Sequence, residues 1–161
     1  MKKLLLSFCM CLLLHSIQAQ VSYYKGEWRK GDKGDLFECF CRIEIKNKIV
    51  TGKLIWTYMA ADSADSFMVD FYKGKKGKKA VEYVNGAFNP STNDMSFEGG
   101  KLTDPSFIFV VDKYQLKLST NKQVLYGRSS NNDANNGFFY AMKLTTPGID
   151  KEFERSLSSV N

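Results

Sequence analysis

Cys39 and Cys41 lie two positions apart in a segment where apolar and polar residues alternate. Alternate residues of a β-strand share a face, and at ~3.3 Å per residue their Cα atoms would lie roughly 6.6 Å apart. This spacing is near the upper limit of disulfide geometry. The pair therefore predicts either a reducible disulfide or two small core side chains in line with Phe37 and Ile43.

Glu82 is a single carboxylate within the otherwise largely apolar segment Ala80–Phe88. If it shares the inner face with Val84, it must be paired or have a raised pKa. It could then hydrogen-bond a ligand, act as an acid, or pair with Arg128. If Val81 faces inward instead, Glu82 is solvated. The alternation does not decide between these two registers.

Several aromatic residues fall on positions that are predicted to face inward. In a small barrel such residues either fill the core or line a small pocket, and buried hydroxyl and indole N–H groups need partners. Together with Glu82 and Arg128, they form the candidate ligand-binding set. The aromatic members are Trp28, Trp56, Tyr58, Tyr114 and Tyr126.

The segment Lys73–Lys79 contains five lysines and two glycines, and it is predicted to form a hairpin tip. Clustered ammonium groups on a flexible turn could bind a phosphate, an anionic lipid surface or a polyanionic glycan. A solvated turn that discourages edge pairing is the alternative. The candidate anion- or partner-binding residues are Lys75, Lys76, Lys78 and Lys79.

The first nineteen residues have the pattern of a secretory signal peptide. Lys2 and Lys3 precede the apolar stretch Leu4–Leu14, and the small residue Ala19 marks a cleavage site. The stretch is shorter than the ~20 residues that a membrane span requires. We therefore expect an exported protein, periplasmic or extracellular, that does not span the membrane.

Cleavage near Ala19 changes which chemistry is available. Removing 19 of 161 residues leaves 142, without His15, which is the only histidine, and with two of the four cysteines. The formal charge falls from +6 to +4, because the leader carries two lysines. Histidine-based catalysis is therefore excluded from the mature protein, and neither a metal nor another cofactor is expected. A modest charge of mixed sign does not predict nucleic-acid binding.

The pattern along the chain predicts an all-β fold. Short alternating segments separated by turn residues are typical of strands in sequential hairpins. They lie at 23–29, 36–46, 49–59, 67–72, 79–88, 95–98, 106–111, 114–119, 124–128 and 138–144. We expect an antiparallel up-and-down barrel of about 8–10 strands, or else a sandwich.

The end of the chain differs from the rest. Ile149, Phe153 and Leu157 are spaced by four, which predicts a short C-terminal helix. The expected organisation is a signal peptide at 1–19, a single barrel domain at 20–145, and a tail with this helix at 146–161.

Two stretches resemble the calycin barrels, the group that includes lipocalins and avidins. Gly26-Glu27-Trp28 resembles the Gly-x-Trp of their first strand, and Val50–Leu54 leading into Trp56 and Tyr58 is similar to the second avidin hairpin. The resemblance implies a barrel that holds a small apolar or amphiphilic ligand in its mouth. The chain also resembles exported proteins of Bacteroidetes-type bacteria.

The chain departs from these families at two points. Lipocalins place a late arginine over the first-strand tryptophan, so Arg128 or Lys143 would have to take that place here. The biotin-binding residues of avidins cannot be traced in this chain, so we expect no biotin binding.

Three functions are compatible with these features, and the sequence favours binding over catalysis. The first is a non-catalytic, lipocalin-like protein that binds a small apolar or amphiphilic ligand. The second is a surface protein that binds an anionic partner or another protein through Lys73–Lys79 and exposed apolar residues such as Phe40 and Ile55. The third is a carboxylate-based enzyme centred on Glu82.

Overall fold

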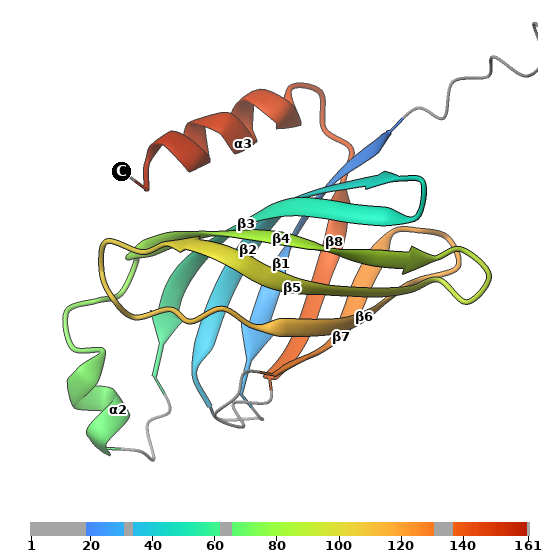
Figure 1. Cartoon of the computed structure of the whole chain (residues 1–161). Coiled ribbons are helices and arrows are strands. Elements are labelled where there is room, and N and C mark those ends of the chain that lie inside the picture. The colour runs from blue at the N-terminus through green and yellow to red at the C-terminus, as the bar shows by residue number, and fades with distance from the viewer. Residues whose placement is uncertain (1–18, 31–33, 62–65, 131–136, 161) are drawn as a thin grey trace, which may run out of the picture.

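The computed structural model describes residues 19–30, 34–61, 66–130 and 137–160, and it contains a closed antiparallel barrel (Figure 1). The predicted signal peptide, apart from Ala19, lies outside the described residues, and so its cleavage is not tested by the structure. The elements are β1 (Gln20–Arg29), β2 (Leu36–Lys46), β3 (Ile49–Ala60), α2 (Ser66–Phe71), β4 (Lys79–Asn89), β5 (Asp94–Thr103), β6 (Lys113–Leu118), β7 (Val124–Ser130), β8 (Gly137–Leu144) and α3 (Ile149–Ser158).

The barrel follows the order of the chain. Each strand pairs with the next in antiparallel fashion, and β1 also pairs with β8 to close the sheet. Eight strands therefore form an up-and-down barrel, as predicted, and the sandwich alternative is wrong. Closure leaves no free strand edge around the sheet.

Alternation along the first hairpin sets the inner face. On β2, Cys39, Cys41 and Ile43 are buried inside the barrel, and on β3 so are Leu54 and Trp56. This is the face that the period-two pattern predicted. Apolar side chains from this inner face fill most of the barrel interior.

The segment 67–72 is a helix rather than the predicted strand. The amide of Tyr72, the residue after α2, donates to the Met68 carbonyl at 3.0 Å. Phe67 and Phe71 stack on each other with ring centroids 6.4 Å apart. The apolar run resembles a strand, but contacts four residues apart determine the structure.

The segment 106–111 is also not a strand. The Asp104 carboxylate accepts hydrogen bonds from the backbone amides of Ser106, Ile108 and Phe109 at 2.6 to 2.8 Å. The Asp104 side chain thus accepts hydrogen bonds from backbone amides that, in a strand, would donate to the neighbouring strand. The segment instead forms the link from β5 to β6, and Ile108 is buried in the core.

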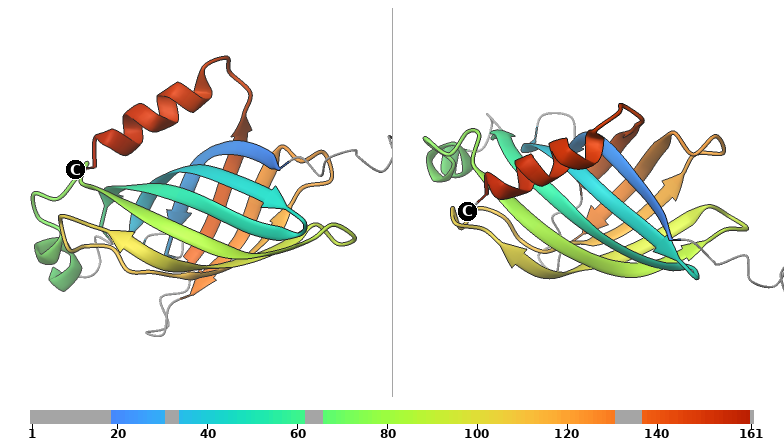
Figure 2. Two further views of the ribbon diagram at one scale, coloured as in Figure 1. Left: turned by 45° about the horizontal axis from the view of Figure 1, so that its top comes forward. Right: turned by 90° about the horizontal axis from the view of Figure 1, so that it is seen from above.

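α3 crosses the outside of the barrel over β2, β3 and β4 (Figure 2). Phe153 is fully buried beneath it, in a second apolar cluster with Phe40, Ile55 and Val81. Phe40 and Ile55 are therefore not the exposed residues that the sequence suggested. The predicted C-terminal helix is confirmed. Because it covers the outer side of these three strands, residues on both of their faces are buried.

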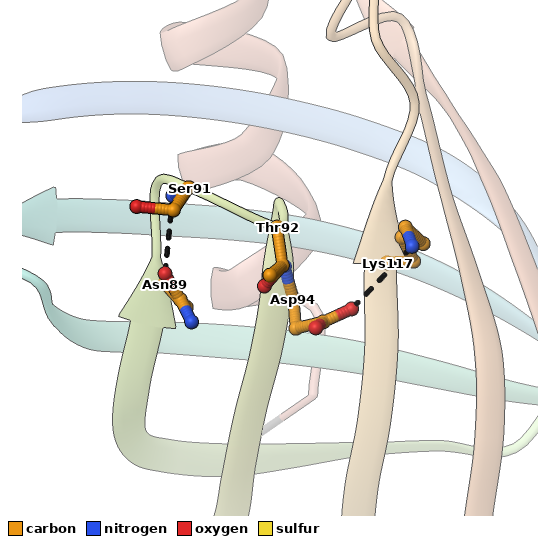
Figure 3. Close-up of polar contacts among 5 residues, drawn as sticks. All are labelled: Asn89, Ser91, Thr92, Asp94 and Lys117. Carbon is orange, nitrogen blue, oxygen red and sulfur yellow. Dashed lines mark hydrogen bonds and ion pairs between the residues drawn. The ribbon is translucent and has the colours of Figure 1, made fainter.

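The end of the barrel opposite α2 consists of tight turns (Figure 1). Between β4 and β5 the Ser91 amide donates to Asn89 Oδ1 at 3.0 Å, and Lys117 of β6 forms an ion pair with Asp94 at 3.8 Å (Figure 3). This turn is polar and exposed. It provides a comparison surface remote from the site described next.

Candidate ligand-binding site

A cavity of about 80 Å³ lies at the α2 end of the barrel. It is bounded by α2, by the link between β5 and β6, and by side chains from inside the barrel. Six aromatic residues form most of its wall: Trp28, Phe37, Trp56, Tyr72, Phe109 and Tyr114. The cavity therefore has an apolar wall, as a small-molecule site requires.

α2 closes part of this end because the helix presents two side chains to the cavity. Met68 and Tyr72 both belong to the lining, and Tyr72 stacks on Tyr58 of β3 with ring centroids 4.3 Å apart. Phe37 makes an edge contact with Tyr58 at 5.4 Å. The aromatic wall is thus continuous from α2 into the barrel.

Glu82 is completely buried below this wall, on the inner face of β4. Its Oε2 accepts hydrogen bonds from Trp56 Nε1 at 2.9 Å and from the Tyr114 hydroxyl at 2.6 Å. Its Oε1 accepts the Asp112 amide at 3.1 Å. The structure thereby resolves the register that the sequence left open, and Glu82 has its partners inside the protein.

A β-bulge in the β4–β5 pairing brings Asp112 next to Glu82. The register shifts after Tyr83, and the Gly99 amide donates to the Asp112 carbonyl at 2.9 Å. A β-carbon at Gly99 would overlap Glu82 Oε1, so only glycine fits this approach. Backbone contacts from β5 therefore hold the start of β6 against the buried carboxylate.

Asp112 belongs to a second hydrogen-bonded chain. Its Oδ2 accepts the Ser129 hydroxyl at 2.5 Å, and Ser129 Oγ accepts Trp28 Nε1 at 2.6 Å. The other oxygen, Oδ1, is buried and has no hydrogen-bond partner among the described residues. Since Asp112 also lines the cavity, one carboxylate oxygen at this site lacks a donor.

Burial changes the ionisation of these groups. Desolvation raises the pKa of Glu82 to about 7, against the opposing effect of the hydrogen bonds from Tyr114 and Trp56. Burial likewise raises the pKa of Asp112, although the Ser129 hydrogen bond opposes that shift. The pKa of the Tyr114 hydroxyl is raised by burial and by the nearby Glu82.

The predicted ligand set divides into two groups. Trp28, Trp56 and Tyr114 line the cavity, whereas Tyr58 and Glu82 are buried beside it without belonging to its described lining. The prediction that the four aromatic residues face the barrel interior is confirmed by their burial in the core cluster. For Glu82, of the two registers left open by the sequence, the structure has the inward one.

Tyr126 does not face the interior, and the prediction that it does is wrong. Arg128, whose pairing with Glu82 the sequence left open, does not face the interior either. Tyr126 is exposed opposite Tyr140 on the outer surface, and Arg128 is exposed as well. The inner face of β7 carries Leu125 and Ser129 instead. Arg128 therefore cannot pair with Glu82.

No arginine covers Trp28 in the part of the barrel that the structure describes. Arg128 is exposed, and Lys143 pairs with Tyr24, four residues before Trp28 on β1. Gly137 lies against the Trp28 indole instead, so close that a β-carbon there would overlap the ring. A glycine and the Ser129 hydrogen bond thus position the tryptophan.

The predicted ligand set lacked three polar residues of the site, and it also lacked six apolar or aromatic lining residues: Phe37, Met68, Tyr72, Ile108, Phe109 and Val110. Ser129 was hidden by the wrong register of β7, and Asp35 and Asp112 lie in connections between strands. Asp112 follows the apolar residues Val110 and Val111, and a carboxylate after an apolar run could have marked it as a candidate. Asp35 offered no such pattern.

The lysine-rich segment connects α2 to β4 and is not the tip of a two-stranded hairpin. Lys75 lies over the Phe71 ring at 3.9 Å, and the Lys79 ammonium donates to Ser159 Oγ at 2.9 Å, next to α3. Lys76 and Lys78 are exposed. These lysines do not belong to the described cavity lining.

Cys39 and Cys41 are free thiols in the structure, with their sulfur atoms 3.2 Å apart and both side chains buried. Burial and the neighbouring Cys41 raise the pKa of Cys39. A disulfide between them stays a prediction. No cluster of three or more metal-ligating side chains occurs among the residues that the structure describes.

Comparison with protein-family models, curated proteins and solved structures finds no match to this chain. In the described ranges, neither α2 nor α3 has the length and apolar character of a membrane-crossing helix. The structure defines an all-β, eight-stranded barrel consistent with a calycin-like fold and with an aromatic-lined interior. Such an interior is compatible with ligand binding.

Proposed function

We propose that this chain is a non-catalytic, lipocalin-like binding protein that holds a small apolar or amphiphilic ligand at the α2 end of its barrel. The observation that carries the proposal is the aromatic-walled cavity of about 80 Å³. Elsewhere the barrel interior is filled by a continuous apolar core. The cavity thus combines apolar walls with few polar groups, as ligand sites do.

The size of the cavity limits what it can enclose. It is smaller than the ~150 Å³ cavity that holds a benzene ring in an engineered protein. A ligand of more than a few non-hydrogen atoms would therefore leave part of itself at the rim. Val110 of the lining is 59% exposed, and Phe107, three residues earlier in the same link, is 86% exposed. An apolar chain could lie along these side chains, which supports an amphiphilic ligand.

Binding is better supported than catalysis. Glu82 has a tyrosine within hydrogen-bond reach, as an acid–base site would need. However, its two oxygens accept three hydrogen bonds from the protein, and it does not belong to the described cavity lining. In this arrangement the carboxylate holds the walls in place.

Export to the periplasm or the extracellular space belongs to the same proposal. The leader pattern supports it, and β1 begins at Gln20, directly after the expected cleavage site. Expression with the leader in a secreting host should give a mature protein that starts at Gln20. A chain retained inside the cell with Met1 intact would contradict export.

The binding proposal is tested with n-octanol and n-octylamine, two amphiphiles with the same chain, by native mass spectrometry and titration calorimetry. At least one should bind with 1:1 stoichiometry. Met68→Trp should fill the cavity and weaken that binding by about tenfold or more, equivalent to ~1.4 kcal/mol. Val69→Trp, on the exposed side of the same helix, is the matched control. The proposal fails if neither amphiphile binds, or if both variants bind like wild type.

A further inference from the structure

Asp112, a residue of the cavity lining, has a carboxylate oxygen that the protein leaves without a donor. Its Oδ1 is buried and unpartnered among the described residues, while Oδ2 accepts the Ser129 hydroxyl. A buried acceptor without a donor is unfavourable in free energy, and more so when it is charged. A ligand that supplies the missing donor recovers this free energy on binding.

The charges of the lining all have one sign. Asp35 and Asp112 are its ionisable carboxyl residues, and no lysine or arginine occurs among the described lining residues. Glu82 adds a third carboxyl group directly behind Asp112, through the amide hydrogen bond of 3.1 Å. The carboxyl groups of Asp112 and Glu82 would repel an anionic head group when they are ionised, whereas they would attract a cationic one.

The aromatic wall also favours a ligand with a positive charge. Tryptophan and tyrosine rings attract cations through their π-systems, more strongly when the cation is desolvated. Trp28 of β1, Trp56 of β3 and Tyr72, which follows α2, line the same small cavity. Aromatic rings together with a carboxylate are the usual surroundings of a bound ammonium group.

We infer that the cavity binds the protonated amino group of a small alkylamine, with Asp112 Oδ1 accepting its hydrogen bond and the aromatic side chains enclosing it. This inference rests on the proposed function and narrows the ligand class. An alkylammonium has three N–H donors and a charge, whereas an alcohol offers one donor and no charge. The cavity volume admits the head group and the first carbons, and the remaining chain lies at the exposed rim.

The test compares octylamine, octanol and octanoate, which share a chain and differ in head-group charge. At about pH 7.5 the amine is protonated, because its pKa is close to the ~10.4 of a lysine side chain. The chain's two tryptophans, Trp28 and Trp56, both line the cavity, so their fluorescence reports occupancy directly. Calorimetry supplies the affinity below the micelle concentration of each amphiphile.

Octylamine should bind about tenfold or more tightly than octanol, since a charge-assisted hydrogen bond is stronger than one between neutral groups. Octanoate should show no saturable binding. Asp112→Asn should reduce the preference for octylamine to about threefold or less while leaving octanol affinity unchanged. Asp94→Asn removes one charge at the opposite end of the barrel and should leave the preference intact (Figure 3).

Each outcome separates the inference from the proposed function. If octanol or octanoate binds as tightly as octylamine, the inference fails and the binding function stands. If none of the three binds, both fail. If Asp112→Asn is folded by circular dichroism and keeps the full preference, Asp112 is not the recognising group and the inference fails. Should that variant not fold, the wild-type ratio of octylamine to octanol affinity still decides.

Discussion

The Trp56 indole on β3 donates a 2.9 Å hydrogen bond to the carboxylate of Glu82 on the adjacent strand β4. The same carboxylate accepts the Tyr114 hydroxyl of β6 and the Asp112 amide. One buried group therefore links β3 and β4 to β6, two strands further along the sheet. Since Trp56, Asp112 and Tyr114 line the cavity, the carboxylate also fixes the walls of the proposed binding site.

Replacing Glu82 by glutamine should destabilise the protein by about 1–3 kcal/mol. The carboxylate only accepts hydrogen bonds, whereas one side of the amide is an NH₂ donor. In either orientation that donor would face another donor, from Asp112 on one side or from Trp56 and Tyr114 on the other. Urea denaturation followed by tryptophan fluorescence measures the free energy of unfolding.

Glu98→Gln is the matched control, because Glu98 is an exposed glutamate on β5. Its free energy of unfolding should lie within about 0.5 kcal/mol of wild type. Equal stabilities of the Glu82 and Glu98 variants would show that the three hydrogen bonds contribute little to folding.

The raised pKa of Glu82 predicts a pH dependence of stability with a definite sign. Between its ordinary value of 4.5 and its folded value of about 7, the carboxyl group is more protonated in the folded chain than in the unfolded one. Stability should therefore fall as pH rises through this window and level off above it, by about 3 kcal/mol in all. Asp112, whose pKa is also raised by burial, contributes with the same sign.

The contribution of Glu82 is isolated by comparing wild type with Glu82→Gln at each pH. The difference between their free energies of unfolding should shrink from pH 5 to pH 7.5, because only wild type loses a proton there. Tyr114, Asp112 and Cys39 face the same carboxylate and are present in both proteins. A difference that is constant with pH would mean that Glu82 is ionised throughout.

The barrel could be predicted from the sequence because its determinants are local. The alternation over β2 and β3 and the turn between them specify a hairpin, and later hairpins repeat this pattern. The helix α2 and the Asp104 link could not be predicted in this way. Both contain short apolar runs that resemble strands, but contacts four residues apart in α2 and the Asp104 side chain bound to three amides determine their structure.

The site could be predicted only in part, because tertiary packing determines whether a side chain points into the barrel or out of it. Glu82 was ambiguous because α3 buries Val81 on the other side of β4, so both faces are apolar. On β7 the more apolar face is the exposed one, with Tyr126 beside other exposed aromatic residues of β8. Ser129 therefore stayed hidden, although it links Trp28 to Asp112.

The two cysteines should be reduced and protected in the folded protein that begins at Gln20. Their side chains are at most 1% exposed, and burial raises the pKa of Cys39, so little reactive thiolate forms. A thiol reagent should modify no cysteine in native buffer and both after denaturation in guanidinium. If no thiol titrates in denaturant until a reductant is added, the predicted Cys39–Cys41 disulfide is present.

Phe153 should carry most of the attachment of α3 to the barrel. Its ring is fully buried, with centroids 5.0 Å from Phe40 and 5.6 Å from Tyr23. Phe153→Ala should destabilise the protein by about 3–5 kcal/mol if the helix stays docked, since the cavity left behind cannot close fully. Glu152→Ala, one residue away on the exposed side, should change stability by less than about 0.5 kcal/mol. Thermal denaturation of the two variants measures the contrast, and equal melting temperatures would show that α3 is not held by this contact.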